Sequence, residues 1–529
     1  MNRRGFARVL AQFGAVGLTG AAQAAPVPGA RFAHLETSVV ELQALMTSGK
    51  LSARTLVAAY LGRIRALDQR GPTLRSVIEI NPDALAIAAD LDDERRLRGP
   101  RGPLHGIPVL LKDNIVSTDR MDTTAGSLAL VGVRPPRDAH LVQNLRAAGA
   151  VILGKTNLSE WANIRSTRSS SGWSARGGLT RNPYALDRNT SGSSSGSAAA
   201  IAANFAAVAV GTETDGSIVS PASINGLVGL KPTVGLVSRD GIIPISHTQD
   251  TAGPMARSVA DAAALLSVMA GPDVGDPATA SAKPADYTAF LNQQRLAGAR
   301  LGVVRAQFGA HPGVNAVTEH ALAVLKAQGA VLVDPVELKN TEKYADAELE
   351  VLLYELKAGL RTWLAYFAPD APIQSLKDLI AWNERNRARE MPWFGQELFE
   401  QAEQRGGLSD KAYLDALATC RRYAREEGID AALAEYKLDA LVAPTGGPAW
   451  ITDLVNGDHF GSSFSGPAAV AGYPHLTVPS GFVNGLPVGL SFVGPAWSEP
   501  LLIGLGFAFE QATHARRPPT FVATLPLQP

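Results

Sequence analysis

Cysteine is almost absent from this sequence, since Cys420 is the single cysteine among 529 residues. One thiol cannot build a disulfide framework, and it cannot supply a cysteine-based zinc cage. The chain also lacks a net charge, because 49 basic side chains balance 49 acidic ones. No overall electrostatic field therefore draws the protein to nucleic acid or to an anionic membrane.

Long apolar runs are missing after the first two dozen residues, so we expect a soluble mature chain without stable membrane association. The composition is that of a globular protein with a large core, with 46% apolar and 19% charged residues. We expect a monomer that acts on a small molecule or a peptide and has no nucleic-acid partner.

Residues 1–24 resemble an export signal of the twin-arginine type. Arg3 and Arg4 give a charged start, and the apolar stretch at 9–22 is too short to cross a bilayer. Ala22-Gln23-Ala24 supplies a small-x-small cleavage site. A frayed N-terminal helix is the alternative. The signal predicts a periplasmic or secreted protein.

The remaining chain, residues 25–529, has the pattern of one large α/β domain. A helix, a glycine and an apolar strand follow one another at 145–153 and again at 325–333, and a further strand is expected at 300–304. This alternation predicts a largely parallel sheet with helices on both faces. Residues 341–437 are rich in Glu, Arg, Leu and Trp and have helical periodicity, which predicts a helical insertion.

Two short motifs suggest other chemistries. Residues 149–156 match the P-loop pattern, but their centre is Ala-Val-Ile-Leu, which favours a buried strand over a phosphate loop. Residues 192–196 match the nucleophile elbow of Ser-His-Asp hydrolases with Ser194 at the centre, and His247, His475 and His514 could supply the base. An elbow needs a preceding strand, and residues 182–191 have turn composition. The apolar centre of residues 149–156 excludes a P-loop, whereas the Ser-His-Asp interpretation stays open.

The segment 190–233 contains more serine and glycine than a core requires, and it alternates with apolar helix and strand patterns. Polar loops of this kind, meeting at a sheet edge, are typical of binding sites. A serine hydroxyl needs a base to become a nucleophile, and these loops contain no histidine. Lys112 ends an apolar strand pattern, where desolvation would lower the lysine pKa and make a neutral amine available. We therefore consider Lys112 the best candidate base.

Together these residues resemble the amidase signature family over nearly the whole mature chain. The motifs that carry the resemblance are Leu104-His-Gly-Ile-Pro, Gly154-Lys-Thr-Asn-Leu, the Gly/Ser run, Gly229-Leu-Lys-Pro-Thr, Asp250-Thr-Ala-Gly-Pro, Ala471-Gly-Tyr-Pro and Gly485-Leu-Pro-Val-Gly. The resemblance implies a single α/β domain around a mixed sheet, with a signature core at about 104–265.

The same resemblance implies a Ser–cis-Ser–Lys triad. Lys112 matches the base, Ser193 the bridging serine and Ser217 the nucleophile, with the two serines 24 positions apart as in the family. The Gly192–Ser193 peptide bond is expected to be cis. Backbone N–H groups of Thr214, Asp215, Gly216 and Ser217 would bind the oxyanion. Ser194 is a further candidate for positioning the loop, and neither a metal nor an organic cofactor is implied.

Within that family the sequence is similar to the bacterial peptide amidase branch, which removes the C-terminal amide of peptides as ammonia. The similarity is carried by Thr212-Glu-Thr-Asp-Gly-Ser-Ile-Val and by Ser171-Gly-Trp-Ser-Ala-Arg-Gly-Gly. The sequence departs from many members at Ser195, Asp215 and Val219. We expect the Asp215 side chain to point away from the oxyanion pocket, because an inward charge would oppose catalysis.

Other functions remain open at this stage. They are a broad-specificity hydrolase of short-chain or aryl amides, the ammonia-producing component of a tRNA-dependent amidotransferase, and a catalytically silent binding protein of the same fold. The presence of Lys112, Ser193 and Ser217 argues against the silent protein, and the export signal argues against the amidotransferase component.

Overall fold

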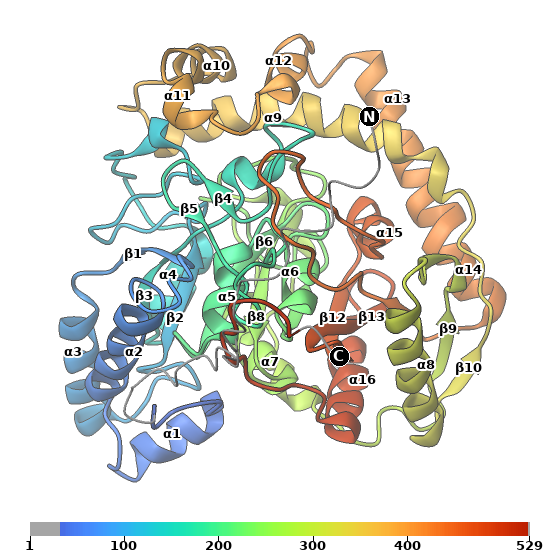
Figure 1. Ribbon diagram of the computed structural model, residues 1–529, viewed down its shortest axis with the longest axis horizontal. Helices are drawn as coiled ribbons and strands as arrows, with labels where there is room; N and C mark the ends of the chain where they lie inside the picture. The colour runs from blue at the N-terminus through green and yellow to red at the C-terminus, as the bar shows by residue number, and fades with distance from the viewer. Residues whose placement is uncertain (1–31, 527–529) are drawn as a thin grey trace, which may run out of the picture. The chain divides into compact units, whose positions relative to one another are not determined.

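The computed structural model describes residues 32–526, and the predicted export signal lies outside them. In these residues eleven strands form one sheet, in the order β1-β3-β2-β6-β8-β7-β12-β13-β11-β9-β10. Figure 1 shows β1 toward one end of this arrangement and β10 at the other. The strands are β1 (Val77–Ile80), β2 (Pro108–Lys112), β3 (Val151–Thr156), β6 (Val208–Glu213), β7 (Val228–Lys231), β8 (Thr251–Ala256), β9 (Arg300–Val303), β10 (Val331–Val333), β11 (Ala440–Pro444), β12 (His475–Val483) and β13 (Leu486–Val493).

The predicted α/β domain with a mixed sheet is confirmed, but the pairing within the sheet is not largely parallel. Parallel pairing is found for β3–β2, β2–β6, β11–β9 and β9–β10. The other six neighbouring pairs in this sheet are antiparallel. The two helix–glycine–strand units lie in the two parallel parts. The antiparallel centre consists of β8, β7 and the β12–β13 hairpin, and antiparallel neighbours need no crossover helix.

Helices cover both faces of the sheet. On one side α4, α7, α16 and α8 contact one another in series, and α5 and α6 form a separate layer. The helices before residue 330 are α1 (Val39–Thr47), α2 (Ala53–Leu67), α3 (Ala84–Arg98), α4 (His140–Ala147), α5 (Ser195–Ala202), α6 (Val219–Ile224), α7 (Val259–Met269) and α8 (Pro312–Ala327). Near the C-terminus lie α15 (Ser465–Ala471) and α16 (Glu499–Thr513).

Local sequence signals explain several boundaries. Ser38 and Glu41 form the capping box that starts α1, with the Ser38 hydroxyl accepting from the Glu41 N–H. Gly149 and Gly329 end the two helices of the helix–glycine–strand units, at φ values of 78° and 90°. A residue with a Cβ adopts this left-handed conformation only at a cost, which is why glycine stands there.

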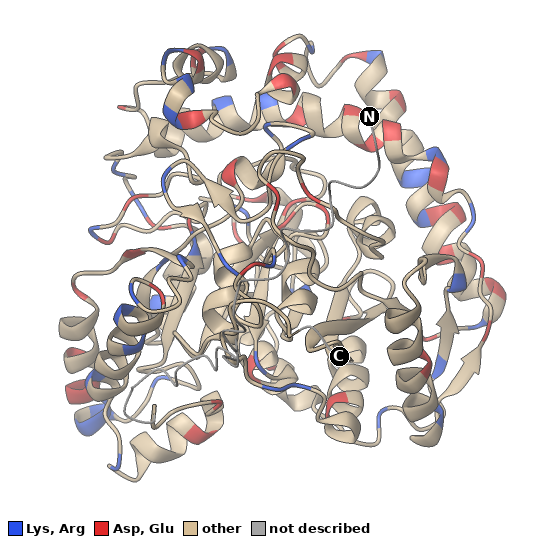
Figure 2. Cartoon of the chain, in the orientation of Figure 1, with Lys and Arg blue, Asp and Glu red and all other residues tan. Residues whose placement is uncertain are grey.

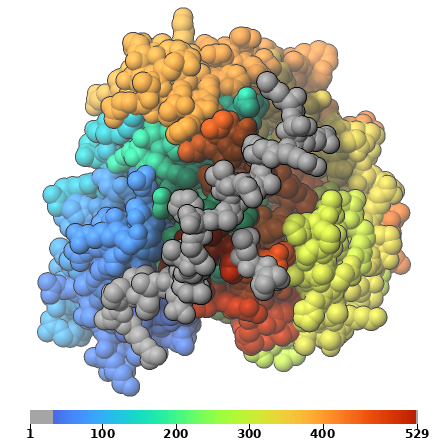
Figure 3. Space-filling view, viewed as in Figure 1, coloured from blue at the N-terminus to red at the C-terminus, as the bar shows by residue number. Residues whose placement is uncertain are grey.

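The segment from α9 onward is helical and lies beside the sheet. Its helices are α9 (Ala345–Phe367), α10 (Leu376–Arg385), α11 (Arg387–Glu390), α12 (Glu397–Glu403), α13 (Lys411–Cys420), the π-helix η7 (Arg421–Ile429) and α14 (Asp430–Tyr436). Figure 3 shows part of this segment along one edge of the face in view. Both acidic and basic side chains are distributed along it (Figure 2). No helix in the described range has the length and apolar character needed to cross a membrane.

Candidate active site

The candidate catalytic residues meet at one edge of the sheet. Lys112 is the last residue of β2, and β6 ends at Glu213. Because β2 and β6 pair in parallel, both strands end at the same edge. Ser193 lies just before α5, and Ser217 lies in the loop between β6 and α6. The topology thus gathers residues that are up to 105 positions apart in the sequence.

Lys112 is fully buried and has three oxygen neighbours. Its Nζ lies 2.8 Å from Ser193 Oγ, 2.8 Å from Thr212 Oγ1 and 3.1 Å from the Thr212 carbonyl oxygen. Asn114 Nδ2 also donates to Thr212 Oγ1, at 3.0 Å. Burial lowers the pKa of Lys112 to about 7, although the charges of Asp250 and Glu213 act in the opposite direction. A large fraction of Lys112 is therefore neutral near pH 7.

The two candidate serines lie on adjacent backbone segments. The Gly192–Ser193 peptide bond is cis, and the Ser194 N–H donates to the Ser217 carbonyl oxygen at 3.1 Å. Ser217 is 7% exposed and lines a cavity of about 740 Å³, so its hydroxyl is open to a substrate. No hydrogen bond within 3.5 Å joins the Ser217 and Ser193 hydroxyls in the described structure.

The loop from Thr214 to Ser217 has the free N–H groups that an oxyanion site requires. Within residues 32–526 none of these four N–H groups donates to another group, whereas the N–H groups of Ile218 and Val219 both donate to Glu213 Oε2. Gly216 has a φ of 75°, and a Cβ at that position would lie 2.9 Å from Ser465 Oγ. Glycine at 216 therefore permits the tight turn against α15.

Asp215 lines this cavity. It is exposed and belongs to the cavity wall, between the buried residues Thr214 and Gly216. A Cβ on Gly466 would lie 3.7 Å from Asp215 Oδ2, so the carboxylate lies against the start of α15. That the side chain points away from the oxyanion N–H groups stays a prediction. Ser194 has a different environment: its hydroxyl donates to the Thr212 carbonyl oxygen at 3.1 Å and accepts from the Thr212 N–H at 3.2 Å. These bonds tie the start of α5 to β6.

The histidines do not support a Ser-His-Asp site. His475 is buried and its Nε2 lies 2.5 Å from Ser491 Oγ, and burial lowers its pKa to about 3. His247 lies 3.4 Å from Glu355. In the described part of the chain none of His247, His475 and His514 is hydrogen-bonded to Ser194. The P-loop interpretation also fails, because residues 151–156 form β3 and Lys155 Nζ is bound to Thr123 Oγ1 at 2.7 Å.

Two further loops line the cavity that contains Ser217. One runs through 162–171 and the other through 456–466; besides small polar residues they bring the side chains of Arg168 and Asp458 to the cavity. The first loop is held from behind by Arg165, which is fully buried and pairs with Glu160. Arg165 Nη1 also donates to the Glu390 carbonyl oxygen at 2.7 Å, so α11 of the helical segment fixes the wall of the cavity.

Three residues of the site were not predicted from the sequence: Thr212, Asn114 and Asp250. Thr212 and Asn114 surround Lys112, and Asp250 Oδ1 accepts from Thr214 Oγ1 at 2.6 Å. Asp250 stands in a motif that carries the family resemblance, and Asn114 is two positions from the candidate base, so both could have been suspected. Thr212 also stands in such a motif, but its position beside Lys112 depends on the register of β2 against β6, which the sequence does not show.

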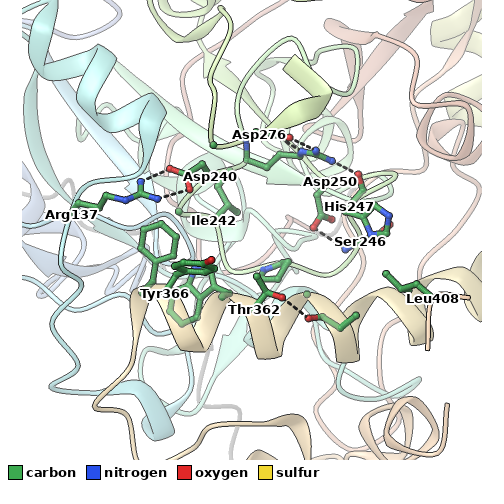
Figure 4. A pocket seen from close by; sticks show the side chains of 18 residues that line it. Arg137, Asp240, Ile242, Ser246, His247, Asp250, Asp276, Thr362, Tyr366 and Leu408 are labelled. Atoms are coloured by element: carbon green, nitrogen blue, oxygen red, sulfur yellow. Dashed lines mark hydrogen bonds and ion pairs between the residues drawn. The ribbon is translucent and has the colours of Figure 1, made fainter. Parts of the chain in front are cut away.

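Asp250 lines a second cavity, of about 570 Å³ (Figure 4). Two ion pairs line it, Arg137 with Asp240 and Arg239 with Asp276. The α9 residues Thr362, Trp363 and Tyr366 form its apolar side. Among residues 32–526 no three His, Cys, Asp or Glu side chains are arranged to hold a metal ion in either cavity or elsewhere.

Comparison with known proteins gives a consistent result. A family model described as Amidase matches residues 55–503. A probable amidase of Arabidopsis thaliana is 42% identical over 504 residues, 93% of each chain. The structure is similar to that of the native peptide amidase from Stenotrophomonas maltophilia, with a TM-score of 0.89, 59% identity and coverage of 93% of this chain and 99% of that one. A glutamyl-tRNA(Gln) amidotransferase component of Chloroflexus aurantiacus is 36% identical over 91% of this chain and 98% of its own. The chain therefore belongs to the amidase signature family and is an amide hydrolase.

Proposed function

We propose that this enzyme hydrolyses the C-terminal amide of peptides to the free acid and ammonia, with Lys112 as base, Ser193 as relay and Ser217 as nucleophile. The observation that carries the proposal is the position of Lys112 Nζ. It lies 2.8 Å from Ser193 Oγ and also contacts both oxygens of Thr212.

The contacts of Lys112 explain how a neutral amine would be oriented. A neutral amine has two N–H bonds and one lone pair. The two Thr212 oxygens can accept both N–H bonds, which leaves the lone pair directed at the Ser193 hydroxyl. Thr212 is thus a positioning residue. Asn114 in turn holds the Thr212 hydroxyl from the other side.

Acylation then follows from this arrangement. Ser193 gives its proton to Lys112 and takes the proton of Ser217, and Ser217 Oγ attacks the amide carbon. The Ser193–Ser217 hydrogen bond would form on substrate binding, as catalytic hydrogen bonds often tighten only in the complex. The free N–H groups at 214–217 would hold the oxyanion, each contributing on the order of 3 kcal/mol to transition-state stability.

Breakdown of the intermediate returns a proton along the same path. Protonated Lys112 gives its proton through Ser193 to the amide nitrogen of the tetrahedral intermediate, and this nitrogen departs as ammonia. Water then attacks the acyl ester of Ser217, with Lys112 accepting a proton through Ser193. The second step releases the peptide acid and restores the hydroxyl of Ser217.

The preference for a C-terminal peptide amide is supported by 59% identity to the Stenotrophomonas peptide amidase over 99% of that chain. The test is mass analysis of an amidated peptide, its methyl ester and its free acid after incubation with the wild-type enzyme and with Ser217→Ala. We expect ammonia release from the amide with an intact backbone, and no reaction with Ser217→Ala. Cleavage of internal peptide bonds, or no reaction of the amide, would contradict the proposal.

Two alternatives use the same catalytic residues. The likeness to the amidotransferase component of Chloroflexus aurantiacus favours testing glutamine as an ammonia donor. Small aryl and short-chain amides test a broad-specificity hydrolase. A higher kcat/KM for glutamine or for a small amide than for the amidated peptide would select one of these alternatives.

We also propose that residues 1–24 direct export through the twin-arginine route. The support is the Arg3-Arg4 pair, the short apolar stretch and the Ala-x-Ala site in the sequence. Intact mass of the protein secreted from a bacterial host tests this. A mature chain beginning at Ala25, lost from the periplasm when Arg3 and Arg4 are both changed to Lys, is the expected result. A full-length cytoplasmic product of the unaltered gene would contradict it.

A further inference from the structure

The cavity that contains Ser217 has a mainly polar wall with one aromatic side chain. Serine, threonine, asparagine and glycine make up most of the lining. Phe460 is the only aromatic residue of the described chain that lines this cavity. It is 49% exposed, although large apolar side chains are most often buried. The wall therefore offers one aromatic surface to a substrate.

Trp450 supports the Phe460 ring. The two rings meet edge to face, with their centroids 5.5 Å apart. Trp450 is buried, and it is held at two points: its carbonyl oxygen accepts from the Asn189 N–H at 2.8 Å, and its Nε1 donates to Asp458 Oδ1 at 3.3 Å. Edge-to-face contact is a favoured arrangement of two aromatic rings. The exposed ring of Phe460 thus rests on a fixed, buried one.

The loop that carries Phe460 is anchored on both sides of this residue. Two positions before it, Asp458 Oδ2 accepts from the Ser171 N–H at 2.9 Å. After it, residues 462–464 pair with residues 445–447 at the end of β11, through backbone hydrogen bonds of 3.1 and 3.2 Å. Phe460 therefore lies between two fixed points of the chain.

Phe460 lies close to the helix turn that follows the nucleophile. Phe460 and Ser220 together line the main cavity, and they also line a small recess that shares these two residues with it. Ser220 is one helical turn after Ser217, and its N–H donates to the Gly216 carbonyl oxygen at 2.8 Å. The aromatic surface is therefore next to the segment that holds the reacting hydroxyl.

The charged groups of the same cavity are of both signs. Arg168 brings an exposed guanidinium, and Asp215 and Asp458 bring carboxylates. The Asp458 carboxylate is already bonded to the protein, through Ser171 and Trp450. A charged substrate side chain therefore meets a repelling as well as an attracting group, whereas an apolar side chain meets Phe460 without such a conflict.

We propose that Phe460 determines specificity by packing against the side chain of the residue that carries the amide, so that the enzyme prefers peptide amides whose last residue is aromatic or large and apolar. This inference rests on the proposed function. The amide carbon must lie at Ser217 Oγ and its oxygen at the N–H groups of 214–217, and the side chain of the same residue is then within reach of the Phe460 ring. Contact between the two removes apolar surface of both from water.

Two substrates that differ only in one side chain test the inference. They are N-acetylphenylalaninamide and N-acetylalaninamide, and ammonia release gives kcat/KM for each. In the wild-type enzyme we expect kcat/KM to be at least about tenfold higher for the phenylalanine amide. Phe460→Ala should lower this ratio about tenfold, mainly through a higher KM of the phenylalanine amide. Phe460→Leu keeps an apolar wall and should retain most of the ratio.

Phe290→Ala is the matched control. Phe290 is 38% exposed and packs on the buried Tyr287, with the ring centroids 6.2 Å apart, but it does not line the cavity. Its loss should leave the ratio unchanged. A second measurement needs no variant and holds even if Phe460→Ala does not fold: kcat/KM of the wild-type enzyme should rise from the alanine to the leucine to the phenylalanine amide.

The outcomes distinguish the inference from the proposed function. The same ratio in Phe460→Ala and in the wild-type enzyme would overturn the role of Phe460. So would a higher kcat/KM for the α-amide of N-acetylaspartic acid than for the phenylalanine amide, because Arg168 would then select the substrate. If the wild-type enzyme releases no ammonia from any of these amides, the proposed function fails. Calorimetric binding of N-acetylphenylalaninol and N-acetylalaninol to the wild-type enzyme and to Phe460→Ala then decides on Phe460 alone.

Discussion

Thr214 Oγ1 donates a hydrogen bond of 2.6 Å to Asp250 Oδ1, which joins the loop before the nucleophile to the residue before β8. Strands β6 and β8 pair antiparallel with Glu213 opposite Thr251, and this register brings Thr214 next to Asp250. The other carboxylate oxygen, Oδ2, accepts the N–H groups of Ile245 and Ser246, both at 2.8 Å. The carboxylate of Asp250 thus holds the loop at 214–217, with its free N–H groups, against the start of β8. Asp250 also lines the second cavity.

Thr214→Val and Asp250→Asn should separate this positioning role from an electrostatic one. Either change removes the hydrogen bond between Thr214 and the Asp250 carboxylate and loosens the loop. We expect kcat to fall about tenfold, which corresponds to the free energy of one hydrogen bond to a charged group. The negative charge of Asp250 raises the pKa of Lys112, so its loss in Asp250→Asn should lower that pKa. The acidic limb of the pH–rate profile should therefore move to lower pH in Asp250→Asn and stay in place in Thr214→Val. A limb that moves to higher pH in Asp250→Asn would contradict this account.

The pH dependence of the wild-type enzyme should report Lys112. Its pKa of about 7 means that the neutral, basic form grows as the pH rises through 7, so kcat/KM for the amide should rise over the same range. Lys112→Met keeps an unbranched side chain without a base and should lower kcat by about a thousandfold. Thermal unfolding checks that this variant is folded. Activity of folded Lys112→Met near the wild-type level would exclude Lys112 as the base.

The two serines should differ in their chemical reactivity. A fluorophosphonate should attach to Ser217 in the wild-type enzyme, as identified by peptide mapping, because Ser217 lines the cavity. Ser193→Ala should be labelled at Ser217 at least about a hundredfold more slowly, since the relay to Lys112 is lost. Ser217→Ala should not be labelled. Attachment at Ser193 or Ser194 would contradict the assignment.

The buried pair of Arg165 and Glu160 should be important for stability. Both side chains of the pair are fully buried, and the Arg165 guanidinium lies 4.3 Å from the centre of the Phe394 ring. Arg165→Met leaves Glu160 without its partner and should lower the free energy of unfolding by about 3–5 kcal/mol. Urea unfolding measures this change. KM for the peptide amide should also rise, because the wall at 162–171 loses its anchor.

Arg387→Met is the matched control for this prediction. Arg387 forms an ion pair with Glu384 on the surface of the same helical segment, with both side chains exposed. Its loss should change the free energy of unfolding by no more than about 0.5 kcal/mol. Equal losses of stability in the two variants would show that Arg165 has no special role.

Local sequence patterns were sufficient to predict several elements of the fold. The glycines at 149 and 329 and the helices of residues 345–436 appear at their expected places. Each depends on interactions within a few residues. The direction of a strand in the sheet depends on partners that are distant in the sequence. The prediction of a largely parallel sheet therefore missed its antiparallel centre.

The sequence by itself determined which side chains are available for the chemistry: one lysine at the end of an apolar strand, a serine-rich loop and a second serine after Gly216. Only the tertiary structure decided what surrounds them. The register of β2 against β6 places Thr212 at Lys112, the register of β6 against β8 places Asp250 at Thr214, and packing leaves Asp215 exposed in the cavity. Burial and neighbouring charge set the pKa of Lys112, and both arise from contacts between segments that are far apart in the chain.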